Sequence, residues 1–133
     1  MVNLRQKKHV EVFTSAVASA TSPAISTSDY RNVIVTIAYD ATFAGTIKFN
    51  GSAEPTDPDY TTAKGLTNLY SGIQVRERED DSIFDGNDGV VVVAGAANVR
   101  IVEFNTNLLE SISIDLTRTA GTVTVTSQLT TNA

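Results

Sequence analysis

The chain has no cysteine and no tryptophan, and it holds a single histidine. The absence of cysteine excludes disulfides, thiolate metal sites and cysteine nucleophiles. A serine–histidine–aspartate relay needs its histidine at the centre of a site, whereas His9 lies beside a polar N-terminal stretch and no Gly-x-Ser-x-Gly motif is present. We interpret His9 as an exposed residue near a strand edge. We expect no enzymatic activity, no catalytic residue, no metal ligand and no cofactor.

Long apolar runs are also missing. No apolar stretch follows the basic residues of the N-terminus, and no run approaches membrane-spanning length. The net charge is −5, and residues 54–88 hold nine acidic residues against three basic ones. An acidic body gives no electrostatic footprint for nucleic acid. We therefore expect a protein made and kept in a cytosol, with neither nucleic acid nor a membrane as its partner.

The chain does have a clear period of two. In the last stretch, Glu110–Leu129, apolar residues occupy even positions as far as Leu116 and resume on odd positions at Val123. Such alternation is typical of half-buried strands. We interpret the stretch as an antiparallel hairpin with Ala120-Gly121 as its loop, which would pair Leu116 with Val125 and Ile112 with Leu129.

Most of the remaining chain also predicts strands. We place them at His9–Val17, Arg31–Tyr39, Thr42–Asn50, Tyr70–Arg78, Val90–Ala94 and Asn98–Asn105, with the second of these in a central position, Asn50-Gly51 as a turn and Val90–Ala94 as a buried strand. The spacing favours an all-β fold, an antiparallel β-sandwich or jelly-roll-like barrel of about eight or nine strands. We expect a basic polar arm over residues 1–8 and one domain over 9–133, with a long acidic loop at about 51–68.

Several acidic residues invite a functional interpretation. The segment Asp85–Gly89, near Asp80 and Asp81, offers oxygen ligands at the close spacing that calcium prefers, and Asp57-Pro58-Asp59 is a weaker case. Asp and Asn beside Gly are equally what tight turns require, so we favour turns, and calcium binding by these loops stays open. The run from Arg76 to Asp81 is interpreted as solvated. No carboxylate pair stands out for glycoside hydrolysis.

Five residues are candidates for interactions with other molecules. Tyr60 and Tyr70 flank the long loop. They are either platforms for a sugar ring or, as we favour, anchors that hold the loop on the sandwich. Arg5, Lys7 and Lys8 form the basic tip of the N-terminal arm. Such an arm is either disordered or docks on an acidic neighbouring subunit.

Three blocks, Phe43–Ser52, Asn98–Val102 and Leu116–Val125, occur in an order that resembles small β-sandwich structural proteins of tailed bacteriophages, such as head-decoration (cement) proteins. The resemblance covers about residues 31–128. It implies a non-enzymatic protein on the capsid surface of the virion, assembled in the bacterial host cytoplasm. It also implies binding to the major capsid protein or other virion subunits as a homo-oligomer, with a trimer favoured. The alternative is a tail or fibre accessory module that binds host-surface glycans.

Overall fold

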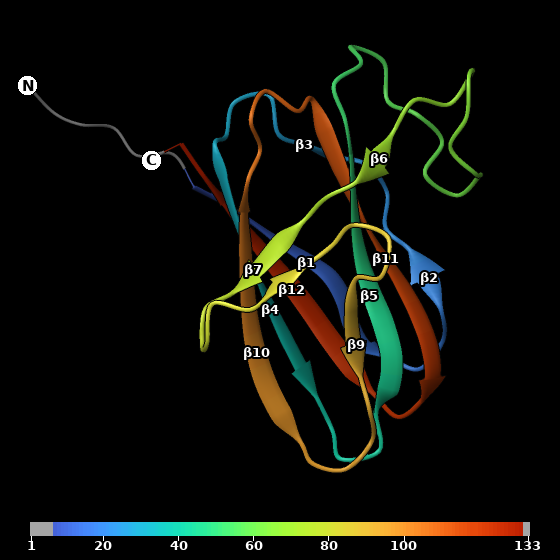
Figure 1. The fold of residues 1–133 in the computed structure, drawn as a ribbon, viewed down its shortest axis with the longest axis vertical. Coiled ribbons are helices and arrows are strands. Elements are labelled where there is room, and N and C mark those ends of the chain that lie inside the picture. The colour runs from blue at the N-terminus through green and yellow to red at the C-terminus, as the bar shows by residue number, and fades with distance from the viewer. Residues whose placement is uncertain (1–6, 132–133) are drawn as a thin grey trace, which may run out of the picture.

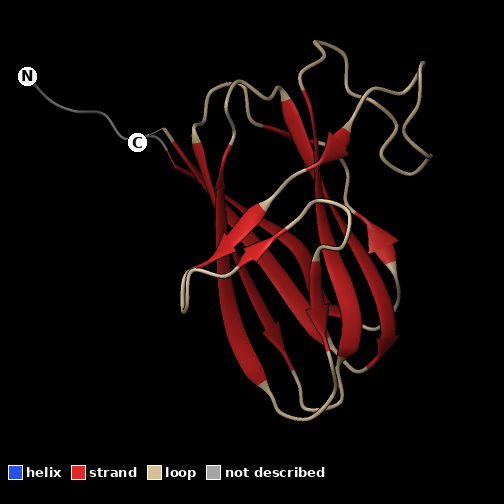
Figure 2. Cartoon of the chain, viewed as in Figure 1, coloured by secondary structure: helices blue, strands red, loops and turns tan. Residues whose placement is uncertain are grey.

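The computed structural model describes residues 7–131, which form an all-β sandwich (Figures 1 and 2). Twelve strands lie in two antiparallel sheets. Sheet A has the order β1 (Lys7–Ala16), β12 (Val123–Thr130), β4 (Asn32–Tyr39), β10 (Asn98–Asn105), β7 (Val75–Glu77) and β8 (Ile83–Phe84). Sheet B is built on β11 (Ser111–Ala120) and β5 (Ala44–Ser52); β2 (Ala20–Thr21) and β3 (Ile25–Ser26) flank β11, and β6 (Ser71–Gly72) and β9 (Val90–Val92) flank β5. Among the described residues no helix is long and apolar enough to cross a membrane.

The core forms where the inward faces of the two sheets meet. The alternation of each long strand supplies it: Val33, Val35 and Ile37 come from β4, and Ile47 and Phe49 come from β5. All five are almost fully buried. β4 lies centrally, between β12 and β10, as its apolar residues predicted. The all-β sandwich is thus confirmed, with six strands of two or three residues added to the six long ones.

The predicted terminal hairpin is wrong. β11 pairs with β5 in sheet B, whereas β12 pairs with β4 and β1 in sheet A, so Leu116 lies opposite Ile47 instead of Val125. The turn at Gly121 carries the chain from one sheet to the other. Glycine is required there because φ is +77° and because a Cβ at this position would collide with the backbone of Phe43. The apolar faces of the two strands still meet, but across the core.

Three further expectations are corrected. Asn50-Gly51 lies inside β5, where Gly51 leaves room for the side chains of Ile73 and Leu109, so it is no turn. The predicted strand Tyr70–Arg78 is divided, since β6 pairs with sheet B and β7 with sheet A. Val90–Ala94 is not a buried strand, because alternate residues of β9 face solvent and Val93 beyond it is 81% exposed.

The polar arm expected over residues 1–8 also changes. Lys7 and Lys8 belong to β1, because their backbone pairs with Thr130 and Leu129 of β12. Both side chains are exposed. Arg5, the third residue of the expected basic tip, lies outside the described residues.

Candidate functional site

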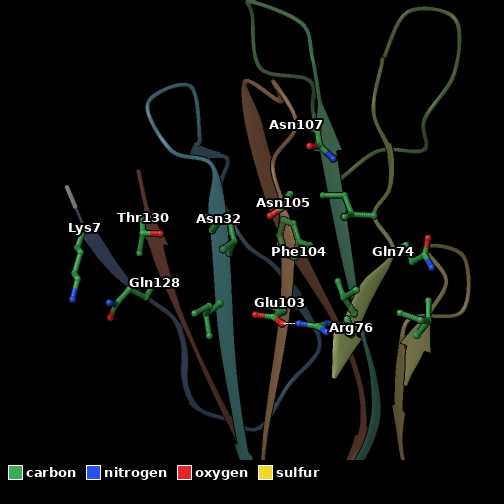
Figure 3. Close-up of a pocket in the computed structure, with 15 residues that line it drawn as sticks. Lys7, Asn32, Gln74, Arg76, Glu103, Phe104, Asn105, Asn107, Gln128 and Thr130 are labelled. Carbon is green, nitrogen blue, oxygen red and sulfur yellow. Dashed lines mark hydrogen bonds and ion pairs between the residues drawn. The ribbon is translucent and has the colours of Figure 1, made fainter. Parts of the chain in front are cut away.

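The first candidate site is a groove on the outer face of sheet A, with a volume of about 910 Å³ (Figure 3). We call it the polar groove after the amide and charged side chains that line it, although Ile34, Ile73 and Ile83 line it as well. Strand register explains how it forms. One row across the sheet brings together Asn105, Asn32, Thr130 and Lys7, from β10, β4, β12 and β1. All four line the groove. These residues occupy the positions between the buried apolar ones, so their side chains point away from the core.

A second row forms the adjoining part of the groove. It runs from Arg76 through Glu103 and Ile34 to Gln128, again one residue from each neighbouring strand. Glu103 accepts a hydrogen bond from Arg76 and another from Arg78 at 3.3 Å. The hydrogen bond from Arg76 to Glu103 raises the pKa of that guanidinium above its usual value, helped by the nearby charge of Glu103. Glu103 is the one carboxylate that lines the described groove, and these ion pairs already engage it.

The groove is therefore suited to binding through hydrogen bonds. Gln74, Asn105, Asn107 and Gln128 each present an amide, which supplies both a donor and an acceptor. In Figure 3, Lys7 and Gln128 lie at one side and Gln74 at the other, with Asn105 between them. Such groups match a ligand rich in hydroxyl or peptide groups.

Tyr60 and Tyr70 anchor the long loop. Tyr60 is 7% exposed, and its hydroxyl reaches the Ser111 Oγ at 2.7 Å and donates to the Ser111 carbonyl at 3.1 Å. Burial raises the pKa of Tyr60. Tyr70 packs on it with ring centroids 5.1 Å apart and donates a hydrogen bond to the Thr62 carbonyl. A buried, hydrogen-bonded ring cannot serve as a sugar platform, so Tyr60 acts as the anchor that we favoured.

The second candidate site is the end of the sandwich that carries loops 53–70 and 106–110, here called the loop end (Figure 1). Both loops are fixed to the junction of β5 and β11, since Ser52 Oγ donates to the Leu69 carbonyl at 2.6 Å and the Ser52 carbonyl accepts from the Glu110 amide. Leu66 is 99% exposed and Leu108 is 92% exposed. Leu108 also has a φ of 71°, which is uncommon for a leucine. The unusual backbone conformation of Leu108 makes it a candidate contact residue.

The acidic loops form turns. The Asp85 Oδ1 accepts the amides of Asn87 at 2.9 Å and Asp88 at 2.7 Å, and the bond from the Asp88 amide is the main reason that the pKa of Asp85 is lowered. The Asp59 Oδ1 likewise accepts from Thr61, which lowers the pKa of Asp59. Within residues 7–131 no group of three or more acidic or histidine side chains is placed to hold a metal ion. His9 lies exposed on β1.

A buried ion pair was missed in the sequence. Glu77 belongs to the run interpreted as solvated, yet its side chain is 6% exposed and its carboxylate accepts two hydrogen bonds from Arg100, at 2.8 and 2.5 Å. The Arg100 guanidinium also lies 5.4 Å from the centroid of the Phe84 ring. The bond to Glu77 raises the pKa of Arg100. The available signal was alternation, because Val75 and Glu77 occupy the same face of β7.

Solved structures of other proteins share this fold. The chain matches the SPBc2 prophage-derived protein YomS with a TM-score of 0.72 and 12% identity, over 98% of this chain and 97% of that one. It matches the PBSX exported protein XepA with a TM-score of 0.72 and 14% identity, over 98% of this chain and 39% of that one. No family model and no curated protein sequence matches. At these identities the likeness shows a common fold.

Proposed function

We propose that this protein is a non-enzymatic structural protein of a bacteriophage virion that binds the head shell as a decoration or cement protein. The single observation that carries the proposal is the match of nearly the whole chain to two solved structures whose names, SPBc2 prophage-derived and PBSX exported, point to phage elements. The three sequence blocks that resemble phage decoration proteins support it independently. In this role the protein is assembled in the host cytoplasm, as a homo-oligomer, on the major capsid protein or another virion subunit.

The loop end is the attachment surface in this proposal. Two leucines that are almost fully exposed, Leu66 and Leu108, project from loops that hydrogen bonds fix to the sandwich. A loop whose backbone is already ordered loses less conformational entropy on binding, and burying each leucine contributes about 1.5–3 kcal/mol. A protein that binds only the assembled shell stabilises it by mass action.

The experiment compares attachment of two variants to particles that lack their own copy of the protein. Leu66→Ser with Leu108→Ser removes the two apolar contacts, and Val93→Ser is the matched control, because Val93 is also exposed but lies in the β9–β10 connection at the opposite end (Figure 1). Co-sedimentation should show binding by the double variant weakened at least about tenfold. Equal binding by wild type and double variant, or equal loss in the control, removes the loop end from the proposal.

The polar groove favours a second function, that of a tail or fibre module that binds host-surface glycan. Its amides suit sugar hydroxyls, although the aromatic platforms first considered for such binding, Tyr60 and Tyr70, serve as loop anchors. A glycan array distinguishes the two functions. A specific signal that is lost in Asn105→Ala and Gln128→Ala supports the glycan module, whereas the head-binding function predicts no signal.

A further inference from the structure

β1 is a long strand, and one of its edges pairs with no other strand among residues 7–131. It lies at the end of sheet A with β12 on one side, and among the described residues it is the only edge strand longer than three residues. Register shifts begin after Glu11, so Lys7–Glu11 is its regular part. A regular free edge presents amide and carbonyl groups in the spacing that another strand requires.

The side chains on this edge carry an ordered charge pattern. Lys7, His9 and Glu11 pair with Thr130, Gln128 and Thr126, the outward residues of β12, and therefore stand on the outer face of sheet A. All three are exposed. No ion pair found between described residues involves Lys7 or Glu11. The pattern places a positive and a negative charge symmetrically about His9.

We propose that β1 pairs with β1 of a second copy of this chain, antiparallel and about a two-fold axis at His9. Such an axis sets His9 opposite His9 of the second copy. It also sets Lys7 of each copy opposite Glu11 of the other, which makes two such pairs. Opposite charges directly across an antiparallel pair attract, and the contact is isologous, as in most homodimers. The two copies of sheet A then form one continuous sheet. Each copy brings its Lys7 and the adjoining groove to the junction.

Charge selects this register over its neighbours. A two-fold axis perpendicular to the sheet keeps each residue on its own face. The competing arrangements are therefore those in which the axis passes through another residue of the strand. With the axis at Lys8, two lysines face each other, and with the axis at Glu11, two glutamates do. With the axis at Val10, Lys7 would fall opposite Phe13, beyond the first register shift. Edge lysines commonly prevent pairing between sheets, but here Glu11 stands where it neutralises Lys7 of the second copy.

An engineered disulfide tests the axis directly, because the chain has no cysteine of its own. Directly opposed residues in an antiparallel pair have Cα atoms about 4.5–5.5 Å apart, within the range of a disulfide. His9→Cys should therefore form a covalent dimer under mild oxidation. Lys8→Cys is the matched control, since the proposed register separates the two copies of residue 8 by about 8 Å. Equal cross-linking of the two variants contradicts the proposed axis.

Charge exchange gives an independent test by sedimentation equilibrium. Lys7→Glu and Glu11→Lys should each weaken the dimer about tenfold, because two attractive pairs become repulsive. A mixture of these two variants should form a heterodimer, and the variant that carries both changes should associate like wild type. A wild-type protein that is a monomer at all concentrations tested, or the trimer that the phage resemblance implied, overturns the proposal. Because this test needs no particle, its result is separate from that of head binding.

Discussion

Replacing Glu77 with Gln should strongly destabilise the fold, because it removes the carboxylate that pairs with the Arg100 guanidinium. Breaking a fully buried ion pair by removing one partner costs about 3–5 kcal/mol. Two features reduce this value: the Arg100 side chain is 16% exposed, and it keeps its contact with the Phe84 ring. Gln also preserves one hydrogen-bond acceptor. We therefore expect the free energy of unfolding to fall by about 2–3 kcal/mol, or roughly 8–12 °C in Tm.

Urea denaturation followed by circular dichroism measures this change, and β7 and β10 supply a matched control. Arg76 and Glu103 form an ion pair between the same two strands, but the Arg76 side chain is 49% exposed, so Arg76→Gln should destabilise the fold much less than Glu77→Gln does. Replacing both Glu77 and Arg100 with leucine should recover most of the loss. A Glu77→Gln value within about 0.5 kcal/mol of wild type, or equal to that of Arg76→Gln, would refute the assignment of a buried pair.

Three other changes follow from the structure. Tyr60→Phe removes the hydroxyl that bonds Ser111 and should lower the free energy of unfolding by about 1–2 kcal/mol, with faster proteolysis of loop 53–70 as the readout. Gly121→Ala forces a side chain into a left-handed position against the backbone of Phe43 and should cost at least about 2 kcal/mol, measured by urea denaturation; an unchanged midpoint would contradict it. The amide of Thr122 donates to the Asp40 carboxylate and lowers the pKa of Asp40 below its ordinary value of 3.8. The stability that the ionised carboxylate contributes is complete above pH 3.8 and is lost as the pH falls through the lowered pKa. Asp40→Asn should therefore flatten the acid side of a profile of melting temperature against pH.

The sequence predicted which residues face the core far better than which strands are neighbours. Alternation placed Val33, Ile47, Ile112 and Val125 inward, and all four are fully buried. In a sandwich both sheets present the same alternation to the core, so the pattern is identical for a hairpin and for two strands in facing sheets. The Ala120-Gly121 turn permits both connections. In the structure the turn passes close to the backbone of Phe43, a non-local contact that no local pattern records.

The polar groove was harder to predict, because strand register creates it. Asn105, Asn32, Thr130 and Lys7 are far apart in the sequence and meet only because four strands align them. Glu77 was misread for a related reason. Its charged neighbours indicated solvent, whereas its inward position on a short strand determined its burial. Short strands such as β7 give too few residues for alternation to be recognised.

The location of the protein on phage particles tests the central claim most directly. Electron cryo-microscopy of particles from the source host, compared with particles that lack this chain, should reveal extra density on the head. The sandwich should fit that density with loops 53–70 and 106–110 toward the shell. Extra density confined to the tail, or no difference between the two particles, would contradict the account.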